Sequence, residues 1–126
     1  MSSLTVTKDI DGNTGLTTLK IDDILFFEYD GRTDRIIVQL KDETYYTVGT
    51  LRYWNKVLNN SGYKFKLVDR NNMVNMNKIK MLDKIFKVAY FETDISSRSK
   101  RCTVSSSNYK ELEKELGMIN PQLGWT

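Results

Sequence analysis

The feature that most constrains the fold is a series of short runs of β-branched and aromatic residues, each ended by a turn signal. Such runs are typical of half-buried β-strands. Turn pairs such as Asp30-Gly31, Lys41-Asp42 and Asp83-Lys84, and the longer loop 11–15, favour antiparallel pairing of the strands they join. The expected strands fall within 4–10, 16–20, 24–29, 35–40, 44–48, 65–68, 73–74, 79–82, 85–91 and 101–104.

Two segments follow a helical period instead. The first is expected to begin at an N-cap, Thr50, and to end within 59–62. Its apolar face consists of Leu51, Trp54, Val57 and Leu58. The second is expected to have a capping box of Asn108 and Glu111 and to end at Gly117. Its apolar face consists of Tyr109, Leu112 and Leu116.

The order of these elements predicts a mostly β protein with two short helices. Strand–helix–strand alternation does not recur, which argues against a parallel doubly wound sheet. No internal repeat or Gly/Ser-rich linker divides the chain. We therefore expect a single domain over residues 1–126, with residues 117–126 forming a tail on its surface.

The composition favours a cytoplasmic protein. Hydrophobic residues make up 40% of the chain and charged residues 28%, which is typical of a globular domain. No apolar run approaches the roughly 20 residues that a membrane span needs. The first nine residues have neither a basic start nor an apolar stretch, so we expect no signal peptide. Cys102 is the only cysteine, which excludes an internal disulfide and favours a reducing compartment.

Enzymatic chemistry is poorly supported by the residues present. The chain has no histidine, so it lacks the commonest general base and the commonest metal ligand. The glycines are scattered singly and form no phosphate-binding loop. The neighbouring acids Asp22/Asp23 and Asp42/Glu43 would point to opposite faces of a strand. We expect no catalytic residues, no metal site and no cofactor.

Charge is distributed unevenly along the chain. Residues 1–63 hold seven Lys and Arg against nine Asp and Glu, whereas residues 64–126 hold twelve against seven. Within 64–110 the count is eleven basic residues against four acidic ones. A basic half of this kind is typical of a surface that binds a polyanion, and also of a solvated lysine-rich surface. Charge alone leaves both interpretations open.

The order of several short motifs resembles the LytTR family of DNA-binding domains. Residues 21–28 are similar to the strand that opens these domains, and residues 50–54 to the start of their first helix. Residues 65–75, ending in Val74-Asn75 and followed by Ile79, resemble the family signature. Residues 104–109 correspond to the segment before the last helix. The resemblance covers about residues 16–116.

The resemblance implies an elongated fold of about ten strands in small antiparallel sheets. It also implies a transcriptional regulator that binds double-stranded DNA through loops in successive major grooves. Family members usually follow a receiver domain, which these residues do not contain, so a stand-alone domain is expected. We expect two copies, as a homodimer or on repeated half-sites of DNA, and no membrane association.

Three segments carry the expected DNA contacts. Arginine side chains can fork onto guanine or grip a phosphate, and asparagine pairs with adenine. Hydroxyl groups at a helix start bind phosphate. A solvated surface turn is the alternative interpretation of each segment. The expected DNA-binding residues are Arg32, Thr33 and Arg35 in the first segment, Arg70 and Asn71 in the second, and Arg98, Lys100, Arg101, Ser105 and Ser107 in the third.

This chain departs from the family pattern at several of these positions. Asp69 stands where the signature has histidine, Ser106 and Ser107 replace a basic pair, and Asp34 stands where some members have a base-reading residue. A carboxylate facing DNA is repelled by phosphates unless it accepts a hydrogen bond from cytosine. The alternative function is therefore a protein-interaction module that antagonises a related regulator, with DNA binding weakened or lost. Compensation by the basic residues at 98–101 is the hypothesis that keeps DNA binding.

Large aromatic residues at strand and helix positions are interpreted as core rather than as a stacking platform for single strands. These residues are Phe26, Tyr45, Trp54 and Phe91. Cys102 is expected to be a small buried residue.

Overall fold

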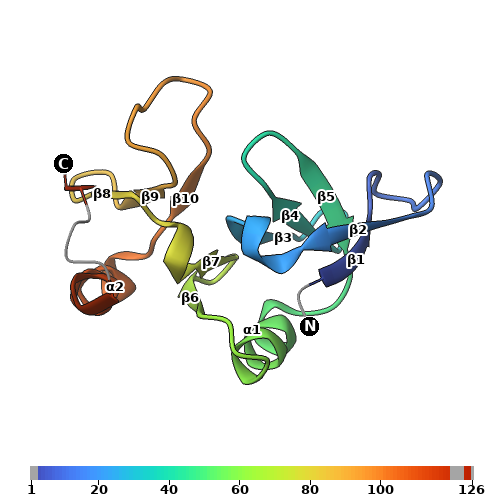
Figure 1. Ribbon diagram of the computed structural model, residues 1–126, viewed down its shortest axis with the longest axis horizontal. Helices are drawn as coiled ribbons and strands as arrows, with labels where there is room; N and C mark the ends of the chain where they lie inside the picture. The colour runs from blue at the N-terminus through green and yellow to red at the C-terminus, as the bar shows by residue number, and fades with distance from the viewer. Residues whose placement is uncertain (1–2, 120–123, 126) are drawn as a thin grey trace.

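The computed structural model describes residues 3–119 and 124–125, and shows two sheets placed one after the other along the long axis (Figure 1). The larger sheet has the strand order β2-β1-β5-β4-β3-β7-β6, and the smaller one β10-β9-β8-β11. The first sheet comprises β1 (Ser3–Thr7), β2 (Leu16–Lys20), β3 (Phe26–Asp30), β4 (Arg35–Gln39), β5 (Thr44–Thr47), β6 (Phe65–Asp69) and β7 (Asn72–Asn75). The second comprises β8 (Met81–Asp83), β9 (Val88–Tyr90), β10 (Arg101–Thr103) and β11 (Gly124–Trp125).

The expected mostly β architecture with two helices is confirmed. All pairs among β1–β10 are antiparallel, and the two-residue β11 runs parallel to β8. The helices are α1 (Leu51–Asn60) and α2 (Ser106–Ile119), with short 3-10 turns at Ile21–Asp23 and Met76–Lys78. In the part of the chain that is described, no helix is long and apolar enough to cross a membrane.

Helix α1 covers one face of the larger sheet. Thr50 is its N-cap, as expected, and its Oγ1 accepts a hydrogen bond from the Tyr53 backbone N–H at 3.0 Å. Leu51 and Leu58 face the sheet and are buried. They join a core cluster that includes Phe27, Ile36, Val38 and Met73.

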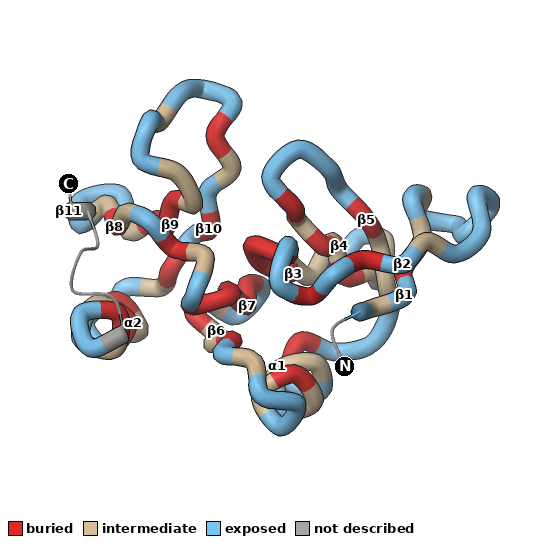
Figure 2. The backbone as a smooth tube through the Cα atoms, viewed as in Figure 1, coloured by how far each residue is buried: buried red, intermediate tan, exposed pale blue. Residues whose placement is uncertain are grey.

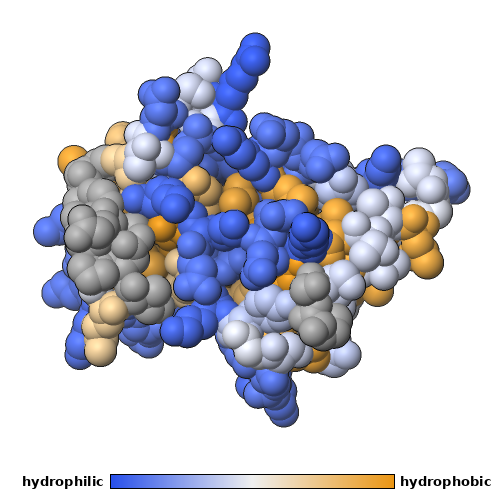
Figure 3. All heavy atoms as spheres, viewed as in Figure 1, coloured by the Kyte–Doolittle hydropathy of each residue, from blue (hydrophilic) through white to orange (hydrophobic). Residues whose placement is uncertain are grey.

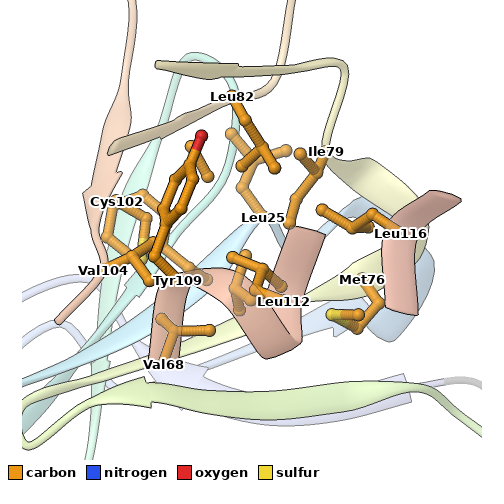
Figure 4. Close-up of a cluster of buried hydrophobic side chains, with 13 residues drawn as sticks. Leu25, Val68, Met76, Ile79, Leu82, Cys102, Val104, Tyr109, Leu112 and Leu116 are labelled. Atoms are coloured by element: carbon orange, nitrogen blue, oxygen red, sulfur yellow. The ribbon is translucent and has the colours of Figure 1, made fainter. Parts of the chain in front are cut away.

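Helix α2 and the smaller sheet cover the opposite face, at the β7–β6 end. The second core cluster lies between them and includes the apolar face of α2, formed by Tyr109, Leu112 and Leu116 (Figure 4). Strand β7 is buried along its whole length: Met73 and Val74 point into the two clusters in turn, and the Asn72 and Asn75 side chains donate to backbone carbonyls. Figure 2 shows this central burial, with the exposed loops around it.

Both expected boundaries of α2 are wrong. Helix α2 begins at Ser106, so Asn108 lies inside its first turn and donates from Nδ2 to the Val68 carbonyl at 3.3 Å instead of capping the helix. Glu111 forms an ion pair with Lys66 at 3.0 Å. The helix also continues through Gly117 to Ile119. Of the expected tail, residues 120–123 and 126 lie outside the described residues.

The turn between β8 and β9 also differs from expectation. The sequence predicts a two-residue turn at Asp83-Lys84 followed by a strand from Ile85. Instead, residues 84–87 all belong to the turn, and β9 begins at Val88. Ile85 and Phe86 were expected to lie in a strand because they are β-branched and aromatic, but their side chains are exposed.

The interpretation of the aromatic residues as core is largely confirmed. Phe26 and Tyr45 are buried, and Phe26 stacks on the half-buried Phe91 with ring centroids 5.5 Å apart. Trp54 is half-buried and donates from Nε1 to the Val48 carbonyl at 2.9 Å. Cys102 is fully buried, as expected, and its burial raises the pKa of the thiol.

Candidate nucleic-acid interface

Four loops that are distant in the sequence meet along one edge of the molecule. We call them the turn edge: residues 30–35, 69–71, 84–87 and 105–107. The Tyr29 N–H donates to the Asn71 carbonyl at 2.9 Å and joins the first two loops. Ser105 N–H donates to the Val68 carbonyl at 2.8 Å, and Val104 N–H to the Lys87 carbonyl at 2.8 Å. These backbone bonds fix the loops relative to one another.

The β3–β4 loop is shaped by Asp30. Its Oδ1 accepts from the Arg32 backbone N–H at 3.0 Å, and its Oδ2 accepts from the Thr33 hydroxyl at 3.1 Å. Asp34 has a left-handed backbone with φ of 54° and accepts from the Tyr29 hydroxyl at 2.9 Å. That hydrogen bond raises the pKa of Tyr29. The Arg32 side chain is 93% exposed, so the loop presents a guanidinium to solvent.

Arg35 differs from Arg32 because its guanidinium holds the loop together. Its Nε donates to the Ile10 carbonyl at 3.0 Å. Its Nη1 donates to the Thr33 and Asp34 carbonyls at 3.2 and 3.1 Å. Arg35 therefore ties the β1–β2 loop to the β3–β4 loop, a role that the sequence pattern did not indicate.

The β6–β7 turn presents Arg70 and Asn71, both exposed. Asp69, which replaces the signature histidine, accepts from the Asn71 backbone N–H through Oδ1 at 2.9 Å. This Asx turn is a common use of aspartate at the start of a tight turn. The carboxylate that appeared unfavourable for DNA binding thus has a structural role.

The start of α2 adds hydroxyl groups to the edge. Ser105 is half-buried, and its Oγ accepts from Asn108 Nδ2 at 2.7 Å and lies 3.3 Å from the Ser107 Oγ. Ser107 is exposed on the first turn of the helix. Because the first backbone N–H groups of a helix have no partner within it, this end suits an anion.

The remaining predicted residues are not on the turn edge. In the register of β9 and β10, Arg101 lies opposite Tyr90 and Thr103 opposite Val88, so Arg101 is at the end of β10 away from α2. We call residues 98–101 the distal group. They form the end of the projecting β9–β10 loop and the first residue of β10, and the side chains of this loop are mainly hydrophilic (Figures 1 and 3). The sequence grouped them with Ser105 and Ser107, and the structure separates the two sets.

Two of the distal cations are engaged within the molecule. Lys100 Nζ donates to the Glu43 carbonyl at 2.7 Å, and partial burial lowers the pKa of Lys100. Arg101 Nη2 donates to the Ser96 carbonyl at 3.2 Å, and its guanidinium lies 5.3 Å from the centre of the Tyr90 ring. Arg98 is exposed. The distal group therefore anchors the β9–β10 loop against β5 and β9.

Sequence reasoning missed several charged residues of the edge. Lys84 and Lys87 lie on the β8–β9 turn, which the pattern assigned largely to a strand. Arg52, in the first turn of α1, helps to line a hollow of about 380 Å³ between the β3–β4 loop, α1 and the β6–β7 turn. Only the tertiary arrangement brings Arg52 to the same hollow as Arg70, and Lys87 beside Val104 before the start of α2. Among the described residues, no cluster of three or more His, Cys, Asp or Glu is placed to hold a metal ion.

Comparisons with known proteins identify the family. Residues 14–117 match the family of the LytTr DNA-binding domain. No curated protein sequence matches the chain. Among solved structures, the fold is similar to a LytTr DNA-binding domain from Bacillus cereus, described as part of a methyl-accepting/DNA response regulator. That similarity has a TM-score of 0.70 at 19% identity and covers 93% of this chain and 98% of that chain. Because the family match spans most of the sequence, the protein belongs to the LytTr DNA-binding domain family.

Proposed function

We propose that this protein is a cytoplasmic transcriptional regulator that binds specific sites on double-stranded DNA, with residues 30–35, 69–71 and 105–107 of the turn edge entering the major groove. The observation that carries the proposal is the set of backbone hydrogen bonds that joins four loops into one edge. A fixed edge that displays guanidinium, amide and hydroxyl groups can read base edges with little ordering cost. Family membership supports DNA as the partner.

The proposed roles follow from exposure and internal contacts. Arg32, Arg70 and Asn71 are exposed and contact bases or phosphates. Thr33, Ser105 and Ser107 contact phosphate or thymine methyl groups. Arg35 positions the β3–β4 loop through its three hydrogen bonds to carbonyls. The distal residues Arg98, Lys100 and Arg101 neutralise phosphates beyond the edge.

Two copies on repeated half-sites are part of the proposal. Specific protein–DNA interfaces bury about 1,000–2,500 Å² of protein surface, and one edge of a protein of this size offers the lower part of that range. A stoichiometry of two proteins per duplex, measured at saturating concentration, would support this arrangement. A single copy at full occupancy would contradict it.

The first test is fluorescence anisotropy with a labelled pool of random-sequence duplex DNA, titrated at several salt concentrations. Binding should weaken with salt along a log–log line, because each phosphate contact releases counterions. Arg70→Ala should reduce the slope by about one and weaken binding. Lys56→Ala removes the same charge from the exposed side of α1 and should change neither.

The major-groove contact has its own test. A site selected from the pool is resynthesised with 7-deazaguanine, which lacks the N7 acceptor but keeps Watson–Crick pairing. Loss of affinity at particular guanines is expected, and the loss should disappear in the variant whose arginine reads that guanine. Unchanged affinity at every position would place the contacts elsewhere on the duplex.

The alternative of a protein-interaction module rested on the departures from the family pattern, Asp69 foremost among them, together with Asp34, Ser106 and Ser107. Since Asp69 accepts the Asn71 N–H within its turn, its presence has an explanation that does not require loss of DNA binding. An absence of any binding at low salt would reverse this preference and direct the search to protein partners.

A further inference from the structure

The tip of the β8–β9 hairpin exposes two adjacent large apolar side chains. Ile85 is 83% exposed and Phe86 is 76% exposed, and both lie in the turn at residues 84–87. Exposed apolar residues are common singly, but a bulky adjacent pair on a projecting turn indicates a contact surface. Lys84 and Lys87 flank the pair on either side.

The turn keeps its shape without help from these two side chains. Asp83 Oδ1 accepts from the backbone N–H groups of Ile85 and Phe86 at 2.9 and 3.0 Å. Lys87 Nζ donates to the Lys84 carbonyl at 2.7 Å, and Lys87 has a left-handed backbone with φ of 55°. The apolar side chains are therefore presented by a preformed turn, and replacing them removes no contact that holds it.

The position of the tip identifies its partner. The Lys87 backbone carbonyl accepts from the Val104 N–H at 2.8 Å, and the Lys87 Nζ lies 5.0 Å from the centre of the Tyr109 ring, so the tip adjoins the start of α2. Within the turn edge, the tip is thus next to the segments that carry Arg70 and Ser107. Flanking lysines favour a polyanion over an apolar protein face. Apolar side chains between cations suit a DNA groove, where a wedge can enter a base step while the lysines contact phosphates.

We propose that Ile85 and Phe86 enter the minor groove beside the DNA segment bound by the other three parts of the turn edge, partly unstack a base step and bend the DNA. This inference rests on the proposed DNA-binding function. We assign the tip to the minor groove because the two grooves alternate along the duplex. The minor groove therefore adjoins the major groove that the other edge segments contact. Side-chain wedges of this chemistry act there, and unstacking is offset by the contacts that the bent DNA gains.

The test compares the wild-type protein with Ile85→Ser/Phe86→Ser, which retains Lys84 and Lys87. The probe is a duplex selected from the random pool, with 2-aminopurine placed in turn at each adenine and fluorophores at both ends. Wild-type protein should raise 2-aminopurine fluorescence at one step and increase energy transfer between the ends. The double variant should lose both signals and bind about tenfold more weakly, with an unchanged salt slope.

Leu16→Ser is the matched control, because Leu16 is an exposed apolar residue, 78% exposed, on β2. It should leave unstacking, bending and affinity as in the wild type, and urea denaturation should show that all proteins are folded. Equal unstacking and bending by the wild type and the double variant would overturn the wedge while leaving DNA binding intact. The wedge would also be overturned if ultracentrifugation showed a concentration-dependent dimer of the wild type that the double variant cannot form, while the DNA signals of the two proteins were the same. Failure of the wild type to bind DNA would overturn the proposed function itself.

Discussion

Aspartate side chains fix the loops of this protein by accepting backbone N–H groups. Asp30 and Asp69 do so within the turn edge, and Asp83 does so for the part of the edge at residues 84–87. Asp9 does the same in the β1–β2 loop, where it accepts from Asn13 and Thr14. The carboxylates beside the proposed DNA contacts are therefore part of the turn geometry. They lower the positive potential of the edge but keep its arginines in place.

Asp9 should titrate well below an ordinary carboxyl. Hydrogen bonds from the Thr14 hydroxyl and from the Thr14 and Asn13 N–H groups lower its pKa from 3.8 to about 2. A depressed pKa contributes stability that is present above the unfolded value and is lost as pH falls through the folded value. The loop should thus lose this contribution between about pH 4 and pH 2.

Carboxyl NMR titration tests this expectation. Thr14→Val removes the strongest hydrogen-bond donor and should raise the Asp9 midpoint toward 3.8. Thr18→Val, at an exposed position on β2, should not move it. An Asp9 midpoint near 3.8 in the wild-type protein would contradict the assigned hydrogen bonds.

The two roles of Asp69 can be separated by substitution. Asp69→Asn retains an oxygen that accepts the Asn71 N–H and removes one negative charge, so DNA affinity should rise severalfold at low salt. Asp69→Ala removes the charge and the turn contact together, so site-specific affinity should fall relative to Asp69→Asn. Anisotropy with a selected site and with the random pool measures both. Equal DNA affinities of the two variants would mean that the Asp69–Asn71 turn contact does not contribute to DNA binding.

At the scale of elements, the sequence correctly predicted the helix and strand boundaries that depend on neighbouring residues alone. Thr50 begins α1 because its hydroxyl caps the Tyr53 N–H, and that information is local. The first turn of α2 was misjudged because Asn108 binds the Val68 carbonyl, a contact across 40 residues. The β8–β9 turn was misjudged because Ile85 and Phe86 have strand-forming side chains, whereas Asp83 determines the backbone.

The candidate site was predictable to a similar extent. The family resemblance identified the loops with Arg32, Arg70 and Ser105, and these do meet at one edge. The separation of Arg98 and Arg101 from that edge depends on which end of β10 they occupy, and only the register of β9 and β10 determines this. Likewise, the clamp formed by Arg35 needs the Ile10 carbonyl, which is distant in sequence.

The packing of α2 gives a stability prediction at this scale. Leu112 is fully buried in the cluster between α2 and the sheets (Figure 4). Leu112→Ala should lower the free energy of unfolding by about 2–5 kcal/mol, because it removes apolar contacts and leaves a cavity. Lys114→Ala, on the exposed side of the same helix, should change it by less than about 0.5 kcal/mol. Equilibrium urea denaturation measures both, and a loss below 1 kcal/mol for Leu112→Ala would contradict the described core.

At the scale of the whole molecule, the candidate DNA-binding cations form two groups, one on the turn edge and the other in the distal group at residues 98–101. If the turn edge holds the duplex, Arg32→Ala/Arg70→Ala should reduce the salt slope by about two and remove most specific binding. The triple variant Arg98→Ala/Lys100→Ala/Arg101→Ala should have a smaller effect, because two of its side chains bind carbonyls within the protein. Fluorescence anisotropy titrations at several salt concentrations would compare the DNA affinity and the salt slope of the two variants. The reverse order would place the duplex on the side of the β9–β10 loop.

Strand β7 belongs to both hydrophobic clusters, with Met73 facing one and Val74 facing the other. The two ends of the protein therefore share a wall, and neither cluster can close without it. Fragments cut in the 61–64 connection would separate β3 from β7, so that each strand would keep only one of its two neighbours in the sheet. Such pieces should regain structure only when mixed. Because both clusters need β7, we expect them to form together when the chain folds. The four parts of the turn edge should then take up their relative positions in the same step.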